Sequence, residues 1–123
     1  MILVDTSVWI NHLRSHDALL KNLLVKGGVL THPFVIGELS MGVFPKRKEV
    51  IAGLKEIPLA DIMEDEEMLL FIESNSLAGK GIGYVDAHLL GAVSLSKPAK
   101  LLTYDKNLHK VASKMGLSAN FTH

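Results

Sequence analysis

The sequence contains no cysteine, which excludes disulfide bonds and metal sites built on thiolates. This absence is compatible with a reducing cytoplasm, where we expect the protein to act. No apolar run approaches the ~20 residues that a helix needs to span a bilayer. The N-terminus also lacks the basic segment and long apolar stretch of a signal peptide. We therefore expect no membrane partner.

An excess of basic charge is also lacking, since 13 Lys and Arg residues balance 13 Asp and Glu residues. This balance argues against a simple nucleic-acid-binding module, which usually carries a basic surplus. It argues less against a metal-dependent nuclease, in which bound metal offsets acidic groups. The length of 123 residues and the hydrophobic content of 48% predict a single domain over residues 1–123 with one core.

Short apolar runs alternate with helical patterns along the chain. This alternation predicts an α/β fold, a three-layer α/β/α sandwich around a mostly parallel sheet of four or five strands. The segment 65–78 is expected to form a well-buried helix, because residues 68–72 are apolar nearly all round. The expected strands are 2–4, 29–31, 57–59, 101–103 and 119–121, and the other expected helices lie near 9–13, 19–24, 35–43, 45–55, 86–95 and 108–115.

Two acidic residues follow predicted strands. Asp5 comes directly after Ile2, Leu3 and Val4, and Asp105 comes two residues after the strand that ends at Thr103. In open parallel sheets, ligands bind beyond the carboxyl ends of the strands. The alternative is that each aspartate caps the helix that follows it.

Two further acids lie on or beside apolar helix faces. At about 100° per residue, Asp86 shares a face with Leu89, Leu90 and Val93. A carboxylate there requires a partner, because unpaired buried charge is costly, although an aspartate in a first turn also favours the helix dipole. Glu38 lies on the flank of an apolar stripe, where it is also compatible with a boundary glutamate that reaches solvent.

Together, the four carboxylates predict a metal site. Like charges brought close together repel and raise one another's pKa, so a cation is their natural partner. Because the ligands offer only oxygen, Mg²⁺ or Mn²⁺ is favoured. Such ions activate water and stabilise charge on a phosphodiester under in-line attack.

Four segments resemble the PIN-domain family, and within it the VapC toxins of bacterial and archaeal toxin–antitoxin pairs. They are MILVDTSVWI at the N-terminus, HPFVIGELSMG at 32–42, GIGYVDAHLLGA at 81–92 and LLTYDKNL at 101–108. The resemblance implies an endoribonuclease dependent on Mg²⁺ or Mn²⁺, with Asp5, Glu38, Asp86 and Asp105 as its catalytic and metal-binding residues. Asp5 and Asp86 would be the most direct ligands. It also implies a VapB antitoxin as partner, RNA as substrate and a homodimer.

Several neighbouring residues have weaker assignments. Thr6, Ser7 and Thr103 are placed to hydrogen-bond the acids or to satisfy local turns. Lys80 lies in a glycine-rich loop at 79–83 that is either a phosphate-binding loop or a plain connector. Of the six histidines, His88 is expected at the surface and His32 in a structural role. Trp9, Ile10, Leu13 and helix 19–24 offer apolar surface, most of it expected in the core, whose exposed remainder is a candidate for an antitoxin or dimer contact.

Three other functions compete with the ribonuclease. A metal-dependent DNase of the flap type would need elements for which this length leaves no room. A receiver-like signalling domain would need paired N-terminal acids, and only Asp5 is found near the start. A degenerate PIN domain that binds RNA or protein without cutting is disfavoured by the presence of all four acids.

Overall fold

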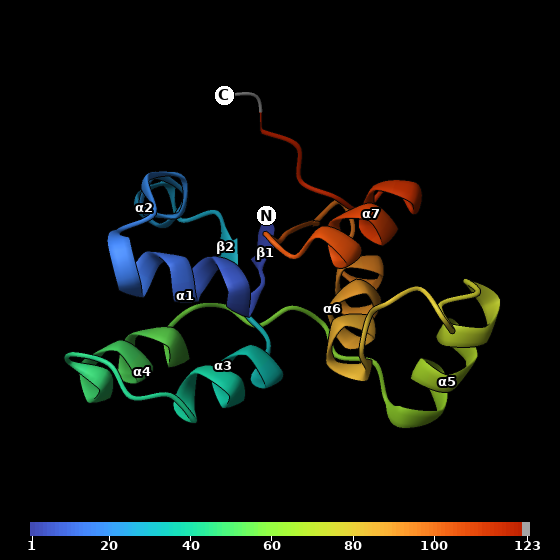
Figure 1. The fold of residues 1–123 in the computed structure, drawn as a ribbon, viewed down its shortest axis with the longest axis horizontal. Coiled ribbons are helices and arrows are strands. Elements are labelled where there is room, and N and C mark those ends of the chain that lie inside the picture. Colours follow the sequence, from blue (N-terminus) through green and yellow to red (C-terminus); the bar gives the residue numbers. More distant parts are fainter. Residues whose placement is uncertain (122–123) are drawn as a thin grey trace.

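The computed structural model describes residues 1–121, and this part of the chain forms three strands and seven helices (Figure 1). The strands are β1 (Ile2–Val4), β2 (Val29–Leu30) and β3 (Lys100–Leu102). The helices are α1 (Thr6–Ser15), α2 (Ala18–Lys26), α3 (Pro33–Ser40), α4 (Arg47–Lys55), α5 (Asp65–Ser74), α6 (Tyr84–Leu95) and α7 (Lys106–Lys114).

The sheet is parallel and has the strand order β2-β1-β3. The number of strands is smaller than the four or five predicted. The segment expected as a strand at 57–59 reduces to a single bridge, Thr31 to Leu59, on one edge. On the other edge no strand forms at 119–121, and the single bridge Leu101 to Ser118 lies one residue before it. One reason on the first edge is Pro58, which has no backbone N–H to donate to a strand ladder.

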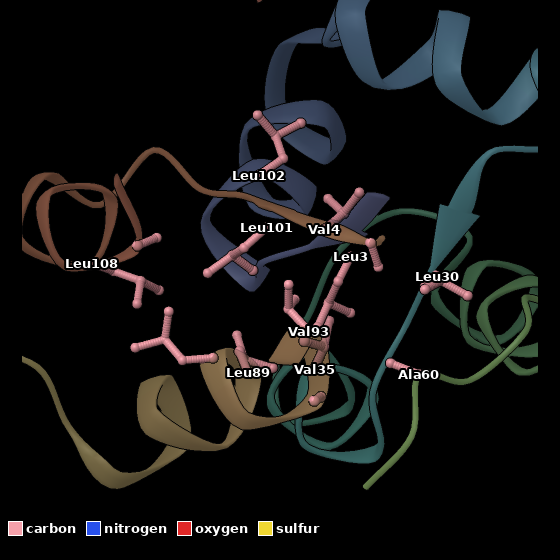
Figure 2. Packing of buried hydrophobic residues seen from close by; sticks show 14 of the residues in the cluster. Leu3, Val4, Leu30, Val35, Ala60, Leu89, Val93, Leu101, Leu102 and Leu108 are labelled. Carbon is pink, nitrogen blue, oxygen red and sulfur yellow. The ribbon is translucent and has the colours of Figure 1, made fainter. Parts of the chain in front are cut away.

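The core covers both faces of the sheet, because neighbouring residues of a strand point to opposite sides. In Figure 2, Leu3 and Leu101 point towards Leu89 and Val93 of α6, whereas Leu102 points towards α1. All of these residues are buried. The predicted α/β class with a mostly parallel sheet is therefore confirmed.

Local signals explain where several helices begin and end. Asp17 caps α2 by accepting a 2.9 Å hydrogen bond from the backbone N–H of Leu20, and Gly27 ends this helix in the left-handed conformation that glycine adopts readily. α3 begins with Pro33, which fits the first position of a helix because its missing N–H would have no partner there.

Two burial predictions were wrong. The helix at 65–74 is not well buried: Met68 is fully buried, but Leu69 and Leu70 are 60% and 68% exposed. α5 contacts mainly α6, so only one side of it meets the core. His88, expected at the surface, is 3% exposed, because α6 is enclosed on nearly all sides from residue 87 to 93. In the described part of the chain, no helix combines the length and apolar character that crossing a membrane requires.

Candidate metal centre

The acidic residues lie at the carboxyl ends of β1 and β3. The chain passes from β1 to β2 on one side of the sheet, while β3 pairs on the other side, so the strand order reverses at β1. Such a switch point opens a crevice at the carboxyl ends of the strands, where ligands bind in open α/β sheets. Asp5 follows β1 directly, and Asp105 lies shortly after β3 as the N-cap residue of α7.

Asp5 is 6% exposed and stands at the N-cap position of α1. Its side chain makes no capping hydrogen bond. Instead its Oδ2 atom accepts 2.7 Å hydrogen bonds from the hydroxyls of Ser7 and Thr103. The alternative of a simple helix cap therefore does not explain the side chain of Asp5.

The direction of these two hydrogen bonds is fixed by the backbone. The Thr103 hydroxyl accepts a 3.0 Å bond from the N–H of Asp105, and the Ser7 hydroxyl accepts a 3.0 Å bond from the N–H of Tyr104. Each hydroxyl has a single proton, which is directed at Asp5. The turn after β3 is thereby joined to the start of α1, and the carboxylate of Asp5 is held in one orientation.

Asp105 and Glu38 are exposed and are each held by one hydrogen bond. Oδ1 of Asp105 accepts from the N–H of Leu108 at 2.9 Å, so this residue does cap α7, as the alternative for it proposed. Oε1 of Glu38 accepts from the hydroxyl of Thr6 at 2.8 Å, which ties α3 to the first residue of α1. The predicted hydrogen bonds of Thr6, Ser7 and Thr103 to the acids are confirmed.

Asp86 has a pKa that the other three acids shift. Burial raises its pKa above the ordinary value of 3.8, and the N–H of Gly83, which donates a 3.0 Å bond to Oδ2, opposes this rise. The charges of Asp5, Asp105 and Glu38 raise the pKa further. The fold therefore brings the four predicted residues into one electrostatic neighbourhood, from four separate segments.

Each of the four carboxylates keeps one oxygen outside these hydrogen bonds. The protein donors engage Oδ2 of Asp5 and Asp86, Oδ1 of Asp105 and Oε1 of Glu38. An all-oxygen donor set with one fixed and one available oxygen per carboxylate suits a hard divalent cation. Within residues 1–121, however, no three of these side chains converge closely enough to form a ready ligand cluster.

One buried acid was not singled out from the sequence. Asp17 is 7% exposed and accepts hydrogen bonds from Asn11 at 2.9 Å and from the hydroxyl of Tyr104 at 2.5 Å. Burial acts to raise the pKa of Asp17, but these bonds outweigh it and the pKa is lowered. Because its oxygens are engaged by protein donors, Asp17 anchors α2 and the turn at Tyr104.

Two histidines, one at the N-cap of α3 and one in α6, form a buried pair. His32 is fully buried, and its Nδ1 accepts from the N–H of Phe34 at 3.0 Å, so its predicted structural role is supported by a capping bond. Its ring lies 6.0 Å from that of His88 between centroids. Burial and this neighbour lower the pKa of His32 to about 4. His123 lies outside the described residues.

Comparison with known proteins agrees with this arrangement. Residues 2–114 match the PIN domain family. Over 118 residues, the chain is 42% identical to ribonuclease VapC32 of Mycobacterium tuberculosis, in strain CDC 1551 and equally in strain H37Rv. The alignment covers 96% of this chain and 95% of each relative. The resemblance drawn from the sequence is confirmed: the chain belongs to the PIN-domain family, and these relatives within it are VapC ribonucleases.

Proposed function

We propose that this chain is a VapC-type endoribonuclease, the toxin of a toxin–antitoxin pair, and that residues 1–123 form its single PIN domain. The observation that carries the proposal is the placement of Asp5 and Asp105 at the carboxyl ends of the neighbouring strands β1 and β3, with Glu38 tied to α1 by Thr6 and Asp86 held at the start of α6. The charges of Asp5, Asp105 and Glu38 all act on Asp86, and carboxylates held near one another favour a divalent cation as their partner. The strong similarity to VapC ribonucleases supports RNA as the substrate.

Asp5, Glu38, Asp86 and Asp105 would hold Mg²⁺ or Mn²⁺. When bound, the ion would acidify water and stabilise the charge that develops on the phosphate. The chain's own residues set up this site. Thr103 and Ser7 orient Asp5, Thr6 orients Glu38, and the backbone of α6 and α7 orients Asp86 and Asp105.

A cleavage assay tests the proposal. Purified protein is incubated with single-stranded RNA and with DNA of the same sequence, in Mg²⁺, Mn²⁺ or EDTA. We expect RNA to be cut internally with either metal and to stay intact in EDTA. Asp5→Asn should abolish cleavage, whereas Asp61→Asn, at an exposed acid outside the site, should not. RNA that remains intact with metal present would instead favour the degenerate, non-catalytic domain.

We place the antitoxin on an apolar groove of about 500 Å³ beside Glu38. The groove is lined by Ile10 and Leu13 of α1, which were predicted as contact surface, and by the segment that follows α3. That segment includes Val43, which is 98% exposed. An occupant of this groove would lie against the acidic site and block access to it. Co-purification with the product of a small adjacent reading frame, lost on Val43→Glu, is the expected result.

We further propose a homodimer, with α5 in the interface. Leu69 and Leu70 are more than half exposed, and Ile62 just before α5 is 47% exposed. Adjacent exposed leucines on one helix are typical of a surface covered by a partner. The cytoplasmic location of the protein stays a prediction.

A further inference from the structure

A second hollow, of about 360 Å³, lies between the end of α5, the glycine-rich loop and α7. The described residues that line it include three lysines and no carboxylate. Lys80 comes from the loop, and Lys110 and Lys114 come from α7. In a protein with zero net charge, this lining is a local concentration of positive charge. It is also distinct from the antitoxin groove, whose lining includes Glu38.

The spacing of the lysines suits a chain of phosphates. Lys110 and Lys114 are four residues apart, so they lie on the same face of α7 with Cβ atoms about 5–6 Å apart. This separation is comparable with that of successive phosphates along an extended strand. One N–H of each amide side chain in the hollow is engaged within the protein: Asn75 donates to the carbonyl of Phe71 and Asn107 to that of Gly81. The three ammonium groups are the positively charged donors that this hollow offers to an anion.

The glycine-rich loop and α7, which line the hollow, are each adjacent in sequence to one of the predicted metal ligands. Asp105 is the N-cap residue of α7, and the glycine-rich loop ends at Gly83, whose N–H holds Asp86. The loop is also fixed against α7, because the side chain of Asn107 donates a 3.2 Å hydrogen bond to Gly81. Gly81 has a φ of +78°, and a Cβ there would lie 2.8 Å from Nδ2 of Asn107. A side chain at position 81 would therefore have to displace the amide of Asn107 that holds the loop against α7.

We propose that this lysine hollow binds the backbone phosphates of the single-stranded RNA substrate on one side of the scissile bond. The proposal rests on the ribonuclease function given above and identifies the residues that position its substrate. Lys80, Lys110 and Lys114 are positioning residues and take no part in the chemistry. Their effect is on affinity and its dependence on salt, because each phosphate that is neutralised releases counterions.

Binding is measured by fluorescence anisotropy of a labelled single-stranded RNA, in a background carrying Asp5→Asn so that no RNA is cut. In this background, Lys80→Gln, Lys110→Gln and Lys114→Gln are combined. We expect weaker binding, and a slope of log K against log salt reduced by about 2, at 0.7 per phosphate contact. The matched control combines Lys21→Gln, Lys48→Gln and Lys55→Gln, which are exposed on α2 and α4 on the other side of the molecule (Figure 1).

The outcomes separate this proposal from the ribonuclease function. Equal loss of affinity in both triple variants, or an unchanged slope in the hollow variant, overturns the lysine site. Loss of antitoxin binding with RNA affinity intact also overturns it. With the acids restored, the hollow variant should raise KM with little change in kcat, and the triple Lys→Arg variant should restore KM. If the intact chain cuts no RNA but the binding difference remains, the ribonuclease function fails and the phosphate site stands.

Discussion

The hydroxyl of Thr103 donates a 2.7 Å hydrogen bond to the carboxylate of Asp5, although the two residues are 98 positions apart in the chain. The same hydroxyl accepts the N–H of Asp105. One side chain therefore links the ends of β1 and β3 and orients one acid of the proposed metal site. Such outer contacts of metal ligands commonly set metal affinity and activity.

Replacing Thr103 should impair cleavage without removing an acid. In Thr103→Val the shape is kept, but Asp5 loses a donor and the N–H of Asp105 loses its acceptor. We expect activity or metal affinity to fall by about 10–100-fold, measured as RNA cleavage against Mg²⁺ concentration. Thr31→Val is the control, because the Thr31 hydroxyl is buried and has no partner in the described structure. Equal activity in both variants would contradict the orienting role.

Asp86→Asn should stabilise the metal-free protein while abolishing cleavage. A carboxyl whose pKa is raised on folding binds protons more readily in the folded state, so its charge opposes folding at neutral pH. The amide removes that charge and keeps an oxygen for the N–H of Gly83. Thermal denaturation at pH 7 in EDTA should give a higher Tm for the variant. Added Mg²⁺ should raise the Tm of the wild type more than that of the variant.

The glycine-rich loop allows a paired comparison of two alanine substitutions. Gly79 and Gly81 both have positive φ, but a Cβ at Gly79 meets open space and one at Gly81 meets Asn107. Gly79→Ala should cost about 1–2 kcal/mol from backbone strain alone. Gly81→Ala should cost more in urea denaturation and should also lower the RNA affinity, since it separates the loop from α7. Identical stability of the two variants would exclude the close approach.

The proposed dimer should depend on the exposed face of α5. Leu69→Glu combined with Leu70→Glu places two like charges on each copy of that face, and we expect sedimentation to show a shift from dimer to monomer. Val25→Glu is the control, because Val25 is 79% exposed on α2. A double variant that sediments as the wild type does would remove α5 from the interface.

The buried histidine pair should make the fold sensitive to acid. Burial lowers the pKa of His88, and burial with His88 lowers that of His32 from 6.5 to about 4. Between these two pH values the unfolded chain binds more protons than the folded chain. The contribution of the neutral His32 to the free energy of unfolding is therefore complete above pH 6.5 and is lost as the pH falls towards 4. His88→Leu should flatten this part of the stability profile in urea denaturation. His16→Asn, at an exposed position, should leave the profile unchanged.

Some of this protein could be predicted from the sequence because the signals are local. The alternation of short apolar runs with helical patterns gave the order of strands and helices. The position of Asp5 directly after a strand placed it at the carboxyl edge of a parallel sheet. Strand pairing could not be predicted in this way. The segments at Leu59 and Ser118 form only single bridges, because the length of a strand depends on how many residues of two distant segments lie side by side.

The tertiary structure decided what depends on contacts between distant segments. Leu70 is exposed and His88 is buried, against the predictions from helical periodicity, because periodicity does not tell how many sides of a helix are covered. The choice between cap and site for Asp5 and Asp105 was also open in the sequence. The tertiary structure shows which donors lie within reach: Thr103 and Ser7 bind the side chain of Asp5 in place of a cap, while Asp105 caps α7 through the N–H of Leu108. The metal-binding role of both residues stays a proposal.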